Sequence, residues 1–376
     1  MNLRLRLLLR AMMFFGMFAI AGTMWAQNFT GTPYKTSSIA LDKQFTHYEV
    51  YQIDAASLFA FIQSSPDFSQ PALVLGDQHW NLQLSPSEIY SPNYTLQVLT
   101  PGGKVETSKP LITKAFKGIE TQGGGHVRLT VDSDFIYGYV YADGTRYFIE
   151  PLWYLDPAAS HDLFVVYKEQ DVIKDANAGT CALIELQEKA EDWIDEDDHV
   201  DSPGAQMLMA CYQLEIAIAS DNSMFNKYGS IGGVENHNIG VLNDVQGDYT
   251  GNFNNDIEFN IVTQFIVTGS DPWSASLNPG TLLDSFRAWG NGGGFGVPFD
   301  NGELWTNRNF TGNVIGIAYL NGICTNNKYH CLQDYTTNSN LLRSLTTHEL
   351  GHNFNSPHDP QGTTFIMSPV NVGSMT

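Results

Sequence analysis

The sequence predicts an α/β domain, of the α+β kind with a mixed sheet, preceded by a mostly β region. Three observations lead to this prediction. Residues 29–168 are dominated by runs with the alternation of strands. Residues 185–204 then form a stretch rich in Asp and Glu that ends in Ser-Pro-Gly. Beyond this stretch, β-branched runs alternate with helical patterns, as expected for strands and helices packed in layers.

The first region contains several short runs with a period of two, which put apolar residues on one face of a strand. FIYGYVYADGTRYFIEPL, at residues 135–152, predicts a hairpin that turns at Asp143-Gly144, because Asp-Gly is a preferred two-residue hairpin turn. The other runs are HWNLQLS at 79–85, YTLQVLT at 94–100 and GHVRLTV at 125–131.

The second region mixes the two periods. Strands are predicted at residues 211–220, 257–269 and 313–324, and helices at 281–290 and 339–354. Residues 221–242 are compatible with a helix, although Gly229, Gly232 and Gly233 interrupt the pattern. The organisation predicted is therefore a β domain at 27–184, an acidic linker at 185–204 and an α/β domain at 205–376.

Composition restricts the function. The 376 residues include 19 basic and 40 acidic side chains, which give a net charge of −21. So acidic a chain is a poor partner for nucleic acid, whose binding requires neutralisation of phosphates. We find no apolar run of 18 residues or more that would predict a membrane span. The oligomeric state cannot be read from these features.

The N-terminus predicts export. Residues 1–26 combine basic Arg4, Arg6 and Arg10 with an apolar run at 11–22 and small residues before Gln27. This pattern is typical of a cleaved secretory signal peptide. We therefore expect a secreted, extracellular protein in which cysteines are able to oxidise.

Four cysteines remain, at 181, 211, 324 and 331. Cys324 and Cys331 are separated by a polar stretch able to turn back on itself, so they are the pair we predict as a disulfide. A disulfide between Cys181 and Cys211 is one of two alternatives for Cys181.

The segment that carries chemistry is HELGHNFNSPHD, at residues 348–359. His348 and His352 are four residues apart, so their imidazoles lie on one face of a helix at a spacing suited to zinc. Glu349 is positioned to reach a water on the metal without ligating it. Asn355 tolerates the left-handed conformation that reverses the chain, which brings His358 back as the third ligand.

This motif resembles the elongated zinc motif of the metzincin peptidases, and its flanks resemble the reprolysin (adamalysin, or ADAM-like) branch. Phe365-Ile366-Met367-Ser368-Pro369 is similar to that branch's Met-turn, with Met367 beneath the metal. The match spans about residues 208–376. It implies a metzincin-like catalytic domain with a mixed sheet, an active-site helix and one catalytic Zn²⁺. Asn355 replaces the family's usual glycine.

The resemblance has further implications. Residues 138–152 and 161–168 are similar to the family's propeptide, so a zymogen is expected. The second alternative for Cys181 is then a cysteine switch on the zinc. Glu215 resembles a residue that helps to bind a structural Ca²⁺ in some relatives, but its partners are not found. The chain ends nine residues after Met367, so we expect a C-terminally truncated domain that lacks the S1′ floor.

These features together predict a secreted zinc endopeptidase that acts on protein or peptide substrates. Glu349 is the predicted general base, and residues 313–320 are the predicted strand that pairs with substrate. The alternative is a secreted binding or adhesion protein that keeps a non-catalytic metzincin scaffold. Neither the substrate nor the activating cleavage is readable from the sequence.

Overall fold

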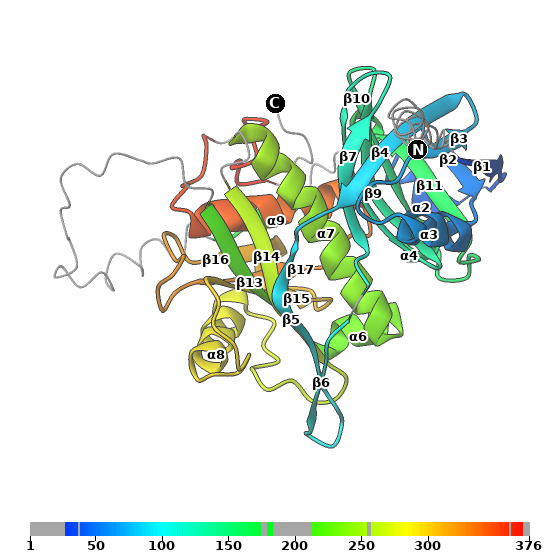
Figure 1. Ribbon diagram of the computed structural model, residues 1–376. Helices are drawn as coiled ribbons and strands as arrows, with labels where there is room; N and C mark the ends of the chain where they lie inside the picture. The colour runs from blue at the N-terminus through cyan, green and yellow to red at the C-terminus, as the bar shows by residue number, and fades with distance from the viewer. Residues whose placement is uncertain are drawn as a thin grey trace, which may run out of the picture.

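The structure is a computed structural model that describes residues 27–36, 38–110, 112–173, 179–182, 212–253, 257–360 and 362–370. The predicted signal peptide, the acidic linker and Cys211 lie outside these residues. Two sheets organise the described chain (Figure 1). No helix in the described part is long and apolar enough to cross a membrane.

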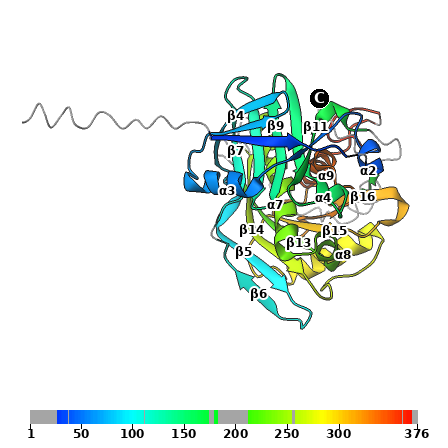
Figure 2. The same ribbon diagram turned by 90° about the vertical axis from the view of Figure 1, so that its right-hand side faces the viewer.

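The first sheet is a closed barrel, seen from its side of the molecule in Figure 2. Its core is filled with apolar side chains, including Trp80, Phe116 and Phe164. In barrel order, the described strands are β1 (Gln27–Pro33), β2 (Glu49–Gln52), β11 (Leu163–Lys168), β10 (Thr145–Pro151), β9 (Phe135–Ala142), β8 (His126–Asp132), β7 (Ala115–Glu120), β4 (Gln78–Pro86) and β3 (Pro71–Leu75). Helical segments beside the barrel are α2 (Ile39–Asp42), α3 (Ala55–Ser64), α4 (Leu152–Leu155) and η1 (Glu169–Asp171).

The predicted hairpin is confirmed as β9 and β10, which pair antiparallel with Thr145 opposite Ala142. Asp143 and Gly144 both have positive φ, at 50° and 73°. Positive φ at both central residues is the conformation of a type I′ turn, which the Asp-Gly pair favours.

The second sheet has the order β12-β16-β17-β15-β13-β14-β5-β6. All neighbours are parallel except β16 with β17 and β5 with β6. Its strands are β5 (Tyr90–Leu99), β6 (Val105–Ser108), β12 (Thr180–Cys181), β13 (Tyr212–Ser220), β14 (Ile257–Val267), β15 (Asn301–Thr306), β16 (Val314–Ala318) and β17 (Tyr329–Gln333).

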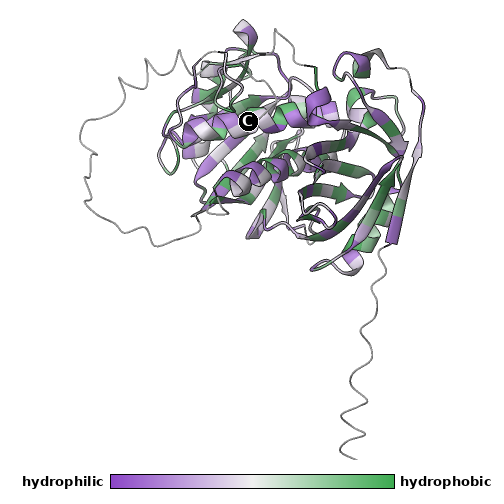
Figure 3. Ribbon diagram, turned by 90° about the horizontal axis from the view of Figure 1, so that it is seen from above, coloured by the Kyte–Doolittle hydropathy of each residue, from purple (hydrophilic) through white to green (hydrophobic). Residues whose placement is uncertain are grey.

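Helices cover both faces of the second sheet. One face packs on α6 (Asn222–Tyr228), α7 (Ile231–Asn252) and α9 (Ser339–Asn353), and the other on α8 (Pro279–Asn291), with the short η2 (Thr311–Asn313) before β16. α7 runs between this sheet and the barrel (Figure 1). Figure 3 shows the hydrophobic colour concentrated in the strands, whereas the long helices carry large hydrophilic stretches.

The glycines at 229–233 separate two helices. Gly229 ends α6 with φ at 69°, and Ser230 caps α7 by accepting from the backbone N–H of Gly233. α7 then continues to Asn252, ten residues beyond the predicted end. Its glycines are places of close approach, because a Cβ on Gly240 would lie 2.7 Å from the ring of Tyr137 in the barrel.

The second sheet receives strands from both predicted domains. Residues 94–100 were predicted as a strand of the first region, and they form most of β5. However, β5 pairs parallel with β14 and not with a barrel strand. We call residues 27–173 the N-terminal part and residues 212–370 the C-terminal part. The predicted domain boundaries at residues 184 and 205 remain a prediction. The structure adds that the two parts share one sheet.

Candidate metal centre

The helix α9 carries the two histidines that are four residues apart. Its N-terminus is capped by Asn338, whose side chain accepts from the backbone N–H of Leu341 at 3.1 Å. The helix is buried along most of its length, and His352 is fully buried. It is therefore held on all sides, and its histidines have fixed positions.

The chain reverses after α9 as the sequence predicts. Asn355 adopts φ of 71°, in the left-handed region, so the expectation that Asn replaces glycine there is confirmed. The N–H of Asn355 donates to the carbonyl of His352, and the N–H of Ser356 donates to the carbonyl of Gly351, each at 2.9 Å. These bonds close the helix end and direct the chain back toward His358.

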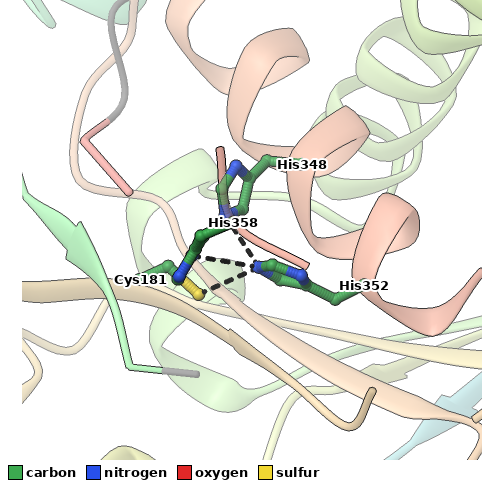
Figure 4. A group of neighbouring side chains, drawn as sticks. All are labelled: Cys181, His348, His352 and His358. Carbon is green, nitrogen blue, oxygen red and sulfur yellow. Dashed lines mark hydrogen bonds between the residues drawn. The ribbon is translucent and has the colours of Figure 1, made fainter. Parts of the chain in front are cut away.

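The three imidazoles converge through the same atom (Figure 4). His348 Nε2 lies 2.9 Å from His352 Nε2, and His358 Nε2 lies 3.2 Å from each of them. The Nδ1 atoms of His348 and His352 face the carbonyl oxygens of Ile366 and Ser356, each at 2.7 Å. Because a carbonyl only accepts, each Nδ1 donates its proton, and each Nε2 is left with a lone pair.

Burial keeps these rings neutral. It lowers the pKa of His348 to about 4 and brings the pKa of His352 still lower, and it also lowers the pKa of His358. At neutral pH all three imidazoles are therefore unprotonated, which is the form that ligates a metal. The Nε2 lone pairs of His348 and His352 face each other at 2.9 Å, an arrangement that is unfavourable unless a cation or a donor lies between them.

Cys181 supplies a fourth ligand-type atom. Among the described residues, one group of three or more metal-ligand side chains is found, and it comprises Cys181, His348, His352 and His358, with all ligand atoms within 4.8 Å of one another. The thiol Sγ lies 3.5 Å from His352 Nε2. Tetrahedral zinc with bonds of about 2.05 Å to nitrogen and 2.3 Å to sulfur would separate N from N by about 3.3 Å and N from S by about 3.6 Å. The three N–N distances of 2.9 to 3.2 Å and the N–S distance of 3.5 Å are close to these values, so the chemistry and spacing of the group suit zinc.

Backbone contacts hold Cys181 beside the three imidazoles, in the space that we call the cleft. β12 pairs parallel with β16, with Cys181 opposite Gly316. On the other side, the N–H of Cys181 donates to the carbonyl of Pro369 at 3.2 Å. The cavity left beside His348 and Glu349 measures only about 10 Å³, which is room for one water at most.

Glu349 lies beside this cluster, fully buried. Its Oε2 accepts from the Cys181 thiol at 3.6 Å, and its Oε1 has no hydrogen-bond partner in the described structure. Burial raises the pKa of Glu349 to about 8. Its carboxyl group packs directly on the backbone of Gly316, where a Cβ would collide with Oε1. The sequence analysis missed this role of Gly316, since a glycine inside a strand signals close approach without naming the partner.

Met367 lies beneath the helix and contributes packing. It is 8% exposed, and a Cβ on Gly351 would lie 2.6 Å from its sulfur. The turn that carries Met367 also supplies the carbonyl of Ile366 to His348, and the carbonyl of Met367 accepts from the N–H of Asp359 at 2.9 Å. The turn thus orients two segments of the cluster.

The predicted disulfide between Cys324 and Cys331 is wrong for this structure, in which both are free thiols. Cys331 is fully buried in β17, among apolar side chains that pack under α8. Cys324 is exposed in a turn with φ of 61°, and its thiol faces Asp300 Oδ1 at 3.5 Å. The chain does reverse before β17, which pairs antiparallel with β16, but Cys331 lies inside β17 and its side chain belongs to the core under α8.

A mixed sheet, an active-site helix with two histidines, a third histidine after a reversal and a methionine turn below define the metzincin class of metallopeptidases. Residues 211–375 match the family model described as metallo-peptidase family M12, of the reprolysin type. Over these residues the chain is similar to the reprolysin family of metzincins.

Curated relatives agree with this assignment. The chain is 25% identical over 296 residues to a zinc metalloproteinase-disintegrin-like protein of Cerberus rynchops, over 74% of this chain and 46% of that protein. It is also 25% identical to the zinc metalloproteinase-disintegrin-like proteins atrase-A and atrase-B of Naja atra, over 75% of this chain and 46% and 48% of theirs. The chain spans about half the length of these relatives.

Proposed function

We propose that this chain is the latent form of a secreted zinc endopeptidase, with His348, His352 and His358 as ligands and Glu349 as general base. The observation that carries the proposal is the convergence of three neutral Nε2 atoms on one point, beside a buried carboxyl group. The match of residues 211–375 to a metallopeptidase family and the predicted signal peptide support it.

Each residue has a distinct part in the proposed hydrolysis. Zinc bound by the three imidazoles supplies Lewis-acid polarisation of a water and of the substrate carbonyl. Glu349 takes the proton of the attacking water on a carboxylate oxygen and passes it to the leaving amine. The backbone of β16 holds the peptide by main-chain hydrogen bonds, as in strand addition to a sheet edge.

The latency that we propose follows from the occupation of the edge of β16 by β12. The N–H of Ala182 donates to the carbonyl of Gly316 at 3.2 Å, so β12 takes the hydrogen-bonding edge that a substrate strand needs. Thr180 also forms an antiparallel bridge with Val370, so the short strand is clamped from both sides. We infer that Cys181 acts as a cysteine switch in this arrangement.

Metal analysis tests the ligand set. We expect His358→Ala to weaken zinc binding at least about a hundredfold, because even the loss of a partner behind a ligand costs about 10–100-fold. The measurement is zinc per chain by elemental analysis after dialysis at neutral pH. The control is His47→Ala, which removes a histidine whose side chain is 84% exposed and should leave the zinc content unchanged. Equal zinc in the two variants would remove His358 from the site.

A second prediction concerns Gly316. We expect Gly316→Ala, made together with Cys181→Ala, to lower kcat about 10–100-fold, because the added methyl group displaces the carboxyl group of Glu349. Zinc content should stay the same, since no ligand is touched. The matched control is Gly232→Ala in the same background, at an exposed position in α7 where a Cβ meets nothing within 4 Å. Unchanged turnover in the Gly316 variant would mean that the carboxyl position is not critical.

A further inference from the structure

The outer edge of β14 is covered by a strand of the N-terminal part. β5 pairs parallel with β14 from Thr95 opposite Thr263 to Leu99 opposite Val267. Side chains strengthen this pairing, because Gln97 Nε2 donates to Thr263 Oγ1 at 3.0 Å and to the carbonyl of Phe295 at 2.7 Å. β6 then closes the sheet beyond β5. The sheet of the C-terminal part is thus completed by the N-terminal part.

The two parts also share one hydrophobic core. The cluster beneath α7 and α9 contains Tyr94, Phe135 and Tyr137 from the N-terminal part, packed with Ile239 and Leu345 from the C-terminal part. Other members of the same cluster from the N-terminal part are Ile89, Leu96, Ala115 and Tyr154. A core of this kind is typical of obligate interfaces, which resemble a domain core cut in half.

α7 packs closely on the barrel through two glycines and a buried asparagine. Its Gly240 and Gly247 lie against the tyrosine side chains of β9, where a Cβ would collide. Asn243 Nδ2 donates to the carbonyls of Phe116 and Leu129, at 3.3 Å each. An amide that bonds to two barrel strands is satisfied only while the barrel is in place.

Buried charges cross the same interface. Arg343 of α9, fully buried, pairs with Asp248 of α7 and with Glu169 of the N-terminal part, the latter at 3.2 Å. Arg146 of β10 approaches Asp248 Oδ1 at 3.5 Å and Glu169 Oε1 at 3.6 Å. Removing the barrel would take two members from a network of four, which is strongly destabilising for buried charges.

The active-site helix itself is supported by the barrel. Glu150 of β10 is fully buried, and its Oε2 accepts from the backbone N–H of Ser339, the first residue of α9, at 3.0 Å. Tyr167 of β11 and Ser339 share a hydroxyl–hydroxyl hydrogen bond at 2.9 Å. An acceptor oxygen at this position satisfies an N–H of the first helical turn, which has no partner within the helix. The C-terminal part therefore depends on the barrel for the start of the helix that carries its histidines.

The contact at the cleft is small by comparison. β12 has two residues, and its described neighbours are residues 179 and 182. We propose that, when the chain is cut between its parts, the N-terminal part stays bound as a permanent subunit of the protein. Only the short strand that carries Cys181 then has to leave the cleft. This proposal rests on the proposed function only where it takes the cut between the two parts as the activating cleavage. The association of the two parts can be tested without measuring hydrolysis.

The experiment uses the full chain with a site for a sequence-specific protease inserted within residues 185–204. After complete cleavage, the sample is diluted to about 100 nM, so that only complexes tighter than this concentration persist, and analysed by size exclusion and native mass spectrometry. We expect both fragments to elute together at a ratio of one to one. Elution of the C-terminal fragment alone, as a folded monomer, would overturn the proposal.

Variants test whether the shared sheet holds the fragments together. Leu96→Asp places a carboxylate in the shared core and should weaken the association of the cut fragments about a hundredfold. Gln97→Ala is a milder variant for use if the first does not fold, with an expected loss of about tenfold. Glu106→Ala, on the exposed strand β6, is the control. Equal association of all three with the parent would refute the sheet as the basis of the complex.

The outcome is separable from that of the proposed function. A stable complex that hydrolyses no protein substrate would refute the peptidase assignment and leave the shared subunit established. Hydrolysis by a C-terminal fragment that has separated from the N-terminal part would support the peptidase assignment and refute the permanent subunit.

Discussion

Glu349→Gln is expected to abolish protein hydrolysis while zinc stays bound. The amide has nearly the shape of the carboxylate, so the three imidazoles should keep their positions, but it cannot accept the proton of the attacking water. Loss of a general base costs about 10²–10⁴ in rate. Burial raises the pKa of Glu349 to about 8, so its carboxylate holds a proton more strongly than an exposed one, which favours proton transfer from the water.

The assay for this variant is the chelator-sensitive cleavage of an unfolded protein, in a chain that also carries Cys181→Ala so that no thiol faces the three imidazoles. Zinc per chain is measured on the same samples. Glu106→Gln, at an exposed position, controls for the change of charge and should retain full activity. Turnover retained in Glu349→Gln would exclude the proposed mechanism. Absence of turnover in every sample, with zinc bound, would favour the non-catalytic binding protein.

The candidate site was largely predictable because its geometry is local. His348 and His352 are related by one helical turn, and His358 follows after a reversal that a single residue makes. The φ of 71° at Asn355 belongs to a region that asparagine enters more readily than most residues. Helix periodicity and turn preference are properties of short segments, so a sequence alone carries them.

The partners of strands were not predictable in the same way. The alternation in residues 94–100 indicates a strand, but it contains no record of which strand lies beside it. Gln97 is the clearest example, because its donors are satisfied by Thr263 and Phe295, which lie more than 160 residues away in the chain. The order in which segments join a sheet depends on the whole core, so the sequence did not indicate that β5 pairs with β14.

The contacts of the cysteines were also not predictable from their positions in the sequence. Cys324 and Cys331 are near in sequence, but the side chain of Cys331 belongs to the core beneath α8. Cys181 is distant in sequence from every histidine of the cluster, yet its thiol lies 3.5 Å from His352 Nε2. Sequence separation therefore says little about which atoms meet. The sequence left two alternatives open for Cys181, and the position of its thiol favours the cysteine switch.

Cys181→Ala is expected to activate the uncut chain. Without the thiol, the position beside the three imidazoles is open, and the cleft is closed only by the backbone pairing of β12 with β16 and with the segment at 369–370. The fraction of molecules with an open cleft should rise, and activity rises with it, by about tenfold or more. The remaining backbone bonds should keep the variant below the activity of the cut protein.

Two measurements test this prediction. Hydrolysis is compared in the uncut parent, in Cys181→Ala and in Cys324→Ser, which changes an exposed thiol outside the cluster of ligand side chains and should leave the chain latent. Thermal unfolding of the same samples tests the disulfide alternative, because the loss of a bridge to Cys211 would lower the stability of the chain and leave its latency intact. An inactive Cys181→Ala chain whose cut form is active would show that latency comes from the strand alone. In that case the thiol beside His352 would have no regulatory part, and the backbone pairing at Gly316 would carry the whole effect.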